Sequence, residues 1–409
     1  MGGLADTQGA RPAVSAAQVR TFRLDVHGLL DHRASGAEAV LAAAGRCGIQ
    51  DSPPGAASTA LHARVRGTTA ETLRHLLATD RTLVRTWAVR GAPFVVPTRD
   101  LAVFTTGVLP VDQGARTHLV GGVRAALEGL PGEFDDYVAA TARAVREVLA
   151  GKQLEIGELG RRVADRIGEH LDTQGREAWS SPGPFAADQE LGEAVVHFCL
   201  RILALQQVVC FGPRSGRAYP FVLVPEWCGA LPRLDAEAAR RELVTRFLHA
   251  YGPSTPAGLA RWLGLRRSDV AAWWGLVTPL LVRVVVEDRV GWVLASDLDA
   301  LRSAGPSGDG GVRLLPPGDP YLQSPDRSVL LQDVTHRRAL WRPVQAPGGV
   351  LLDAELVGTW RGRTTAVGLH VTVEPFRALS RVEVGALRVA ASSLAGMRGA
   401  DEATVTVLG

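Results

Sequence analysis

The chain has 409 residues, of which 46% are hydrophobic and 6% aromatic, as in a folded protein long enough for about two to four domains. It contains no apolar run of about 18 residues and no apolar block near its start, so we expect neither a membrane span nor a signal peptide but a cytoplasmic protein. The net charge of +3 is too small to establish nucleic-acid binding by itself.

The basic residues are almost all arginine. Lys152 is the only lysine among 45 Lys and Arg residues. A coding bias of the genome explains this better than function does, although the planar guanidinium group suits bidentate phosphate contact. The cysteines lack metal-ligand spacing and read as small buried hydrophobes, so no metal or organic cofactor is expected. The cysteines are Cys47, Cys199, Cys210 and Cys228.

The first part of the chain predicts helices followed by a hairpin. Residues 1–17 lack apolar periodicity and are expected to be disordered. Strands are expected over Leu83–Val96, split by a turn at Arg90 to Pro93. Helices followed by a two-stranded hairpin are typical of a winged helix, which we assign to residues 18–130. The preceding helices are expected from Val19, over Glu38–Arg46, over Ala57–Val65 and over Thr69–Thr79. In the last of these, Thr69 is expected to cap the helix and Glu71 to make the reciprocal contact of a capping box.

A second unit of the same order is expected over residues 131–233. Helical periodicity over Phe134–Leu149, Ile156–Leu171 and Glu190–Gln206 is followed by a strand, turn and strand over Val208–Val224. The turn carries Arg214 and Arg217, which suits a wing tip that reaches a backbone phosphate. Ordinary solvated turn arginines are an equally good interpretation of either residue.

The third unit, residues 234–303, has the clearest pattern. Asp235 and Thr255 can each cap a helix, and Gly264 follows the second helix as a C-cap glycine. Arg266 and Arg267 then begin a candidate recognition helix at helix-turn-helix spacing, where such proteins contact DNA. Strands over Leu280–Val286 and Val290–Leu294 supply the wing. Tryptophans with helical spacing in this unit are expected in the core, as is Trp87 in the first.

The last segment, residues 304–409, predicts short strands and one helix from Phe376 to about Leu394. A Gly, Ser and Pro-rich linker over Ala304–Asp309 separates it from the third unit. The fold class expected from the whole chain is therefore helix-rich α+β: three tandem winged-helix-like modules followed by a C-terminal β-rich, barrel-like domain.

One polar stretch stands out, Gln50-Asp51-Ser52-Pro53-Pro54, which places an amide, a carboxylate and a hydroxyl in a row after an Ala-rich segment. On these residues alone the stretch is better explained as a turn in which Asp51 or Ser52 caps the following helix. If it is instead an extended site, Gln50 and Ser52 face one way and Asp51 the other.

Several short motifs follow one another along the chain. They are Thr86-Trp87-Ala88-Val89-Arg90-Gly91, Cys210-Phe211-Gly212-Pro213-Arg214, Glu226-Trp227, Arg261-Trp262-Leu263-Gly264, Asp319-Pro320-Tyr321-Leu322 and Gly358-Thr359-Trp360-Arg361. Together, in this order, they resemble the AlkZ/YcaQ family of winged-helix DNA glycosylases over about Phe22 to Phe376. The opening motif of that family, Gln-x-Gln or Gln-x-Asp, aligns with Gln50 and Ser52, and the serine departs from both forms.

The resemblance implies hydrolysis of the bond between deoxyribose and an alkylated or bulky adducted base, including interstrand cross-links. It makes Gln50, Ser52 and Asp51 the candidate catalytic residues, with the Gln50 carbonyl oxygen holding the water or the sugar. We expect a monomer that binds double-stranded DNA and no membrane, with phosphate contacts from Arg90 as well as from the arginines named above. The alternative is a non-catalytic DNA-binding regulatory or architectural protein in which the motif has decayed into a turn.

Overall fold

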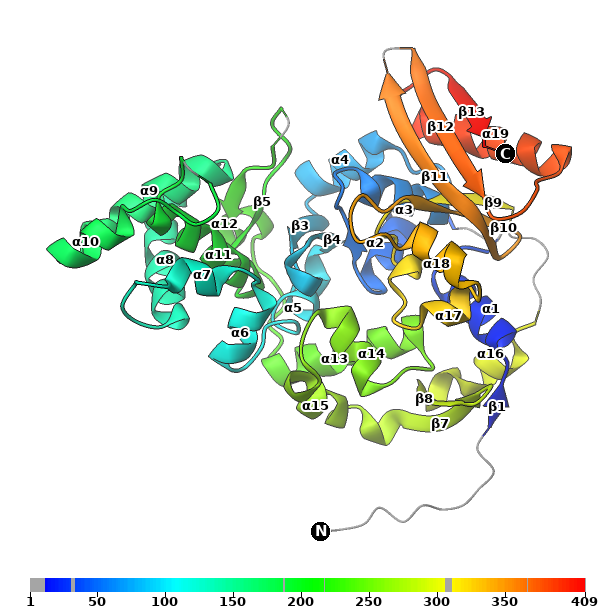
Figure 1. The fold of residues 1–409 in the computed structure, drawn as a ribbon, viewed down its shortest axis with the longest axis horizontal. Helices are drawn as coiled ribbons and strands as arrows, with labels where there is room; N and C mark the ends of the chain where they lie inside the picture. Colours follow the sequence, from blue (N-terminus) through cyan, green and yellow to red (C-terminus); the bar gives the residue numbers. More distant parts are fainter. Residues whose placement is uncertain are drawn as a thin grey trace, which may run out of the picture.

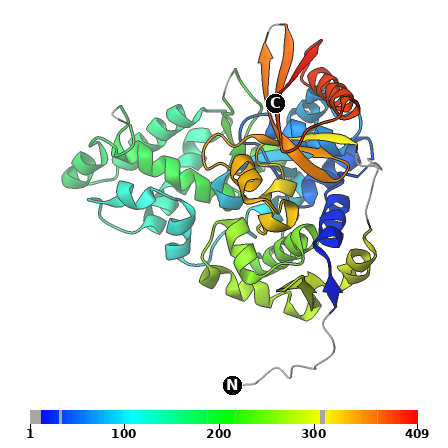
Figure 2. The same cartoon turned by 45° about the vertical axis from the view of Figure 1, so that its right-hand side comes forward.

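The computed structural model describes residues 12–30, 34–186, 188–216, 218–305, 311–365 and 367–408. Helices dominate, and they are joined by three small sheets. A helical lobe formed by residues 113–205 extends to one side of the molecule, and the C-terminal strands project at the top (Figures 1 and 2). Within the described ranges, no helix combines the length and the apolar character needed to cross a bilayer.

The N-terminal region begins earlier than the sequence predicted. Ala13 and Val14 pair in parallel with Val285 and Val286, so disorder is the wrong prediction for these residues, while residues 1–11 lie outside the described part. The capping box at Thr69 uses Thr72 at the third helical position instead of Glu71. The elements of this region are β1 (Ala13–Val14), α1 (Ala16–Val26), α2 (Ala37–Gly45), β2 (Ile49–Gln50), α3 (Ala56–Arg64), α4 (Ala70–Ala78), β3 (Leu83–Trp87), η1 (Val89–Gly91), β4 (Pro93–Pro97), η2 (Thr98–Asp100) and α5 (Leu101–Phe104).

The helical lobe follows, and its hairpin completes a sheet begun in the first region. The two predicted hairpins do not stand apart: they share one sheet with the strand order β2-β4-β3-β5-β6. The connection is the pairing of Arg85 with Phe211. Its elements are α6 (Gln113–Leu119), α7 (Val123–Leu127), α8 (Phe134–Leu149), α9 (Ile156–Gly168), α10 (Thr173–Trp179), α11 (Leu191–Leu205), β5 (Val209–Phe211), β6 (Phe221–Leu223) and α12 (Val224–Cys228).

The third region has the predicted order of helices and hairpin. Asp235 and Thr255 cap their helices through side-chain oxygens, and Gly264 has the left-handed conformation of a C-cap, with φ 70°. Its elements are α13 (Ala236–Tyr251), α14 (Pro256–Leu263), α15 (Arg267–Gly275), η3 (Thr278–Leu280), β7 (Leu281–Val286), β8 (Arg289–Leu294), η4 (Ala295–Asp297) and α16 (Leu298–Ser303).

The C-terminal strands form an open sheet of order β13-β12-β11-β10-β9. No pairing between β9 and β13 closes the described strands into a cylinder, so the expected barrel-like domain is not confirmed. The predicted helix starts later, at Arg381, where Ser380 and Glu383 form a capping box. The elements are β9 (Val312–Leu315), η5 (Tyr321–Gln323), α17 (Arg327–Leu330), α18 (Val334–Leu340), β10 (Gly348–Leu352), β11 (Glu355–Thr365), β12 (Gly368–Pro375), α19 (Arg381–Met397) and β13 (Ala403–Val407).

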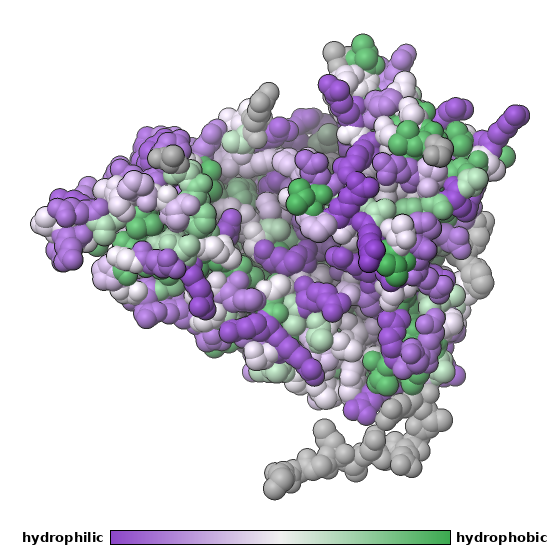
Figure 3. Space-filling model, viewed as in Figure 1, coloured by the Kyte–Doolittle hydropathy of each residue, from purple (hydrophilic) through white to green (hydrophobic). Residues whose placement is uncertain are grey.

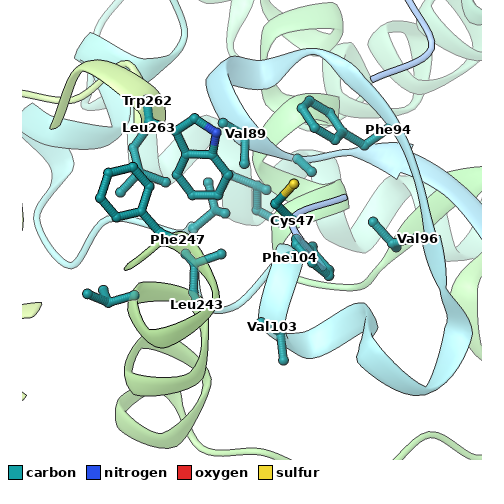
Figure 4. Close-up of a cluster of buried hydrophobic side chains, with 14 of the residues drawn as sticks. Cys47, Val89, Phe94, Val96, Val103, Phe104, Leu243, Phe247, Trp262 and Leu263 are labelled. Carbon is teal, nitrogen blue, oxygen red and sulfur yellow. The ribbon is translucent and has the colours of Figure 1, made fainter. Parts of the chain in front are cut away.

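A continuous apolar core joins the first and third regions. Trp262 of α14 packs against Phe247 of α13, with ring centroids 5.3 Å apart, and both lie in one cluster with Val89 and Phe94 (Figure 4). Trp262 is 2% exposed and Trp87 is 8% exposed, which confirms the prediction that both rings are core residues. The third region therefore packs directly against the turn between β3 and β4.

Candidate functional site

Gln50 lies at the edge of the central sheet. Ile49 and Gln50 pair with Val95 and Phe94 of β4, and the Asp51 amide donates to the Pro93 carbonyl at 2.8 Å. In extended chain, successive side chains alternate. Gln50 and Ser52 line a cleft, whereas Asp51 points inward and is only 5% exposed, as expected for an extended strip.

Asp51 is held entirely by interactions inside the protein. Its Oδ1 accepts hydrogen bonds from the amides of Gly55 at 2.8 Å and Ala57 at 3.0 Å, so it caps the start of α3. Its other oxygen pairs with Arg85, whose guanidinium also lies 3.6 Å from the Tyr219 ring centroid. The helix begins at Ala56, after both prolines. The N-cap residue is Gly55, so neither Asp51 nor Ser52 occupies the cap position that the sequence suggested, although Asp51 accepts from amides at the start of the helix. The structure does not place the Asp51 carboxylate in the cleft.

The side chains of Gln50, Arg90 and Gln323 meet at one point. The Gln50 Oε1 accepts hydrogen bonds from Arg90 Nη2 at 3.0 Å and from Gln323 Nε2 at 3.2 Å. Arg90 Nη2 also donates to Gln323 Oε1 at 2.9 Å, and Arg90 Nη1 to the Trp262 carbonyl at 2.5 Å. The Gln50 Nε2 makes only a long contact, 3.4 Å, to the Ser52 carbonyl. Burial lowers the pKa of Arg90 from its usual value.

A buried ion pair fixes the loop that brings Gln323 to this point. Arg64 donates from both terminal nitrogens to the Asp319 carboxylate, at 2.8 and 2.7 Å, and both side chains are essentially inaccessible to solvent. Asp319 Oδ1 also accepts from the Tyr321 amide at 2.9 Å, and the Tyr251 hydroxyl donates to the Pro320 carbonyl at 2.9 Å. The loop therefore has a rigid base on the side away from the cleft.

The cleft has a volume of about 1110 Å³ and a basic lining, in which Arg85 is paired with Asp51 and Arg74 with Glu71. It is lined by five arginines, and no aspartate or glutamate is among the described residues that line it. It separates the helical lobe from the C-terminal sheet, and the space-filling view of this face shows the hollow between them (Figure 3). The lining arginines are Arg74, Arg85, Arg214, Arg361 and Arg398.

The expected DNA-binding arginines fall in three places. Arg214 lines the cleft from the β5–β6 loop, and Arg217 lies outside the described residues. Arg266 and Arg267 begin α15, which lies far below that loop in two views (Figures 1 and 2). Arg266 pairs there with Asp269 at 2.9 Å. Arg90 is turned to Gln50 and Gln323, so the structure does not present its guanidinium to a phosphate.

Sequence reasoning missed Gln323 and the role of Arg90. The signal was present in part, because Gln323 directly follows the Asp319-Pro320-Tyr321-Leu322 box and Arg90 belongs to the Trp87 box. Nothing in the spacing indicates that these boxes meet, since they are separated by 233 positions. In the described ranges, no group of three His, Cys, Asp or Glu residues is placed to hold a metal ion.

Comparison with known proteins identifies the family of this chain. Residues 43–397 match the family described as DNA glycosylase AlkZ-like. An interstrand DNA cross-link repair glycosylase from Streptomyces sahachiroi is 27% identical over 341 residues, which cover 80% of this chain and 82% of that protein. The solved structure of Streptomyces sahachiroi DNA glycosylase AlkZ has the same fold, with a TM-score of 0.75 and 24% identity over 97% of this chain and 100% of that chain. The chain therefore belongs to the AlkZ-like DNA glycosylase family.

Proposed function

We propose that the protein hydrolyses the N-glycosidic bond of alkylated or bulky adducted bases in double-stranded DNA, interstrand cross-links among them. The observation that carries this proposal is the position of Gln50 and Ser52 on the wall of a cleft of about 1110 Å³ lined by arginine without carboxylates. A cleft of this size accommodates a base with a large substituent. The relative named for cross-link repair supports the inclusion of cross-links.

The proposed reaction requires little acid or base catalysis. The bond between C1′ of the sugar and the base nitrogen breaks, and both electrons pass to the base, which neutralises the positive charge of an N-alkylated purine. A water oxygen forms the new bond to C1′ and its surplus proton leaves to solvent. The protein has to orient that water and to tolerate an oxocarbenium-like sugar, for which neutral groups such as Gln50 and Ser52 suffice.

We propose that binding depends on phosphate contacts from the cleft arginines. Arg214 and Arg361 both line the cleft and are exposed, and neither forms an ion pair in the part of the chain that the structure describes. Arg361 donates to the Gln345 carbonyl at 2.8 Å, and Arg214 lies 6.0 Å from the Tyr219 ring centroid. Affinity that rests on such contacts has little sequence preference and falls as salt rises, because bound counterions are released. We further propose that the enzyme acts as a monomer at the nucleoid.

The proposed modular organisation rests on element order. The helices α13, α14 and α15 followed by the β7–β8 hairpin support a winged-helix module over residues 234–303. We propose two further modules over residues 18–130 and 131–233, each of which contributes one hairpin to the shared sheet. Residues 304–409 then form the C-terminal unit.

A panel of duplexes with one defined lesion each tests the activity. The panel should contain an N7-alkylated purine, a bulky N7 adduct and an interstrand cross-link, with the undamaged duplex as control, and released base should be measured by mass spectrometry. We expect release from damaged duplexes only. Binding to every duplex without release from any of them would contradict the proposal and would support the non-catalytic alternative.

A further inference from the structure

The orientation of the Gln50 carboxamide is fixed by the chemistry of its neighbours. A guanidinium group has donors only, so the oxygen atoms of both Gln50 and Gln323 must face Arg90. The Gln323 nitrogen in turn donates to the Gly318 carbonyl at 2.6 Å, and a carbonyl only accepts. These contacts remove the usual ambiguity between the oxygen and nitrogen of an amide side chain.

This orientation assigns the two ends of the Gln50 carboxamide to different tasks. Both lone pairs of Oε1 are engaged, one by Arg90 and one by Gln323. The Nε2 group carries two N–H donors and has one long contact, to the Ser52 carbonyl. The end of Gln50 that is available to a substrate is therefore its N–H group, and the carbonyl oxygen expected from the sequence is not.

We propose that Arg90 and Gln323 are positioning residues that hold Gln50 so that its N–H group donates to the oxygen of the attacking water. This inference rests on the proposed function and specifies how its central residue works. A water held through one lone pair keeps the second lone pair for C1′. Ser52 lines the same cleft, and its carbonyl lies 3.4 Å from the same Gln50 Nε2.

Backbone geometry around the three side chains supports a specialised role. Arg90 has φ 58° and ψ 21°, a left-handed conformation that is unfavourable for a residue with a side chain and natural for glycine. Gly318 and Gly264 allow the chain to pack closely against Gln50 and Arg90. A Cβ on Gly318 would lie 3.2 Å from the Gln50 Nε2, and a Cβ on Gly264 would lie 2.9 Å from the Arg90 Cγ. Both glycines also have positive φ.

The replacement Arg90→Gly separates positioning from folding. It suits the backbone conformation but removes every guanidinium hydrogen bond to the two carboxamides. We expect single-turnover base release to slow by about 10- to 100-fold, the size of effect that misplacement of a reacting group produces, with duplex affinity within about threefold of the parent. Arg90→Lys, which keeps a donor, should recover part of the rate. Gln323→Leu should slow release in the same direction.

The matched control is Glu287→Gly. Glu287 also has a left-handed conformation, with φ 56°, but lies in the exposed turn between β7 and β8. We expect no change in its rate of release. If Arg90→Gly and Gln323→Leu both retain the parental rate, or if Arg90→Gly lowers affinity and rate equally, the positioning role is overturned.

A spectroscopic measurement keeps this inference separate from the activity itself. The side-chain ¹⁵N–¹H₂ signals of Gln50, assigned by their loss in Gln50→Leu, should show by ¹⁵N relaxation a carboxamide held in one orientation in the parent protein and a mobile one in Arg90→Gly. If no lesion is processed but this order depends on Arg90, the proposed function fails and the positioning role of Arg90 stands. Equal mobility of the carboxamide in both proteins would overturn the positioning role.

Discussion

The two faces of the chain around Gln50 differ in chemical character. On the outer side, Arg90 holds the neutral carboxamides of Gln50, which lines the cleft, and of Gln323, which lies in an adjoining pocket. On the inner side, the acids are closed into buried ion pairs, Asp51 with Arg85 and Asp319 with Arg64. The difference shows that the carboxylates nearest the motif serve the fold. Amides and arginines are left to face a polyanionic substrate, to which an exposed carboxylate would be repulsive.

The largest effect should come from breaking the inner pair of Arg64 and Asp319. Asp319→Ala leaves a guanidinium buried without its partner, and we expect a loss of about 3 to 5 kcal/mol in the free energy of unfolding. Glu237→Ala, which breaks an exposed pair with Arg241, is the control and should cost about 1 kcal/mol or less. Urea titrations compare the variants. Equal losses would mean that the inner pair has no special structural role.

A pH effect should also arise on the inner side, from His27. This side chain is 1% exposed, and burial first, then the charges of Arg64 and Arg46, lower its pKa well below the usual value. The folded protein therefore keeps His27 neutral, whereas the unfolded chain binds a proton below a pH of about 6.5. Stability from this group is fully present above that pH and falls by about 1.4 kcal/mol per unit as the pH decreases from there toward the folded pKa.

The variant His27→Gln isolates this contribution. Unfolding free energies at several pH values between 5 and 8 should decline less steeply for the variant than for the parent. If the unfolding free energies of parent and variant depend on pH in the same way, His27 is not the source of the pH dependence. The inner side would then owe no pH-dependent stability to this residue.

Smaller effects are expected from single arginines on the cleft side. Arg214→Ala and Arg361→Ala should each weaken duplex binding for all sequences and reduce the slope of log affinity against log salt by about 0.9, the value for one phosphate contact. Arg267→Ala, at the start of α15, is the matched control, and we expect a smaller loss because this helix lies away from the cleft. Binding isotherms at several salt concentrations measure both. A larger loss of duplex affinity for Arg267→Ala would indicate that DNA binds along α15 instead of the cleft.

The sequence was sufficient for most elements and insufficient for their assembly. Apolar periodicity predicted α8 over its full length, and cap residues such as Asp235 and Thr255 predicted where helices begin, because these signals are local. The joining of two hairpins in one sheet and the open C-terminal sheet depend on contacts between distant segments, which local patterns do not encode.

The same limit applies to the site. Alternation along an extended strip was enough to predict that Gln50 and Ser52 share a face and that Asp51 does not. It could not predict that Arg90 and Gln323 would engage the Gln50 oxygen. The loop that carries Gln323 is distant in the sequence, and it is fixed in place by the ion pair of Arg64 with Asp319. Arg90 was therefore assigned to phosphate on its charge alone.

Single-turnover base release by Gln50→Ala tests the central claim most directly. We predict a rate lower by about 10² or more, the effect of losing one positioned polar group at a reacting centre, with DNA affinity nearly unchanged. Ser52→Gln should preserve or raise the rate. An unchanged rate for Gln50→Ala, together with a collapse of the rate in a folded Asp51→Asn variant, would contradict the account and would assign the reaction to a carboxylate base.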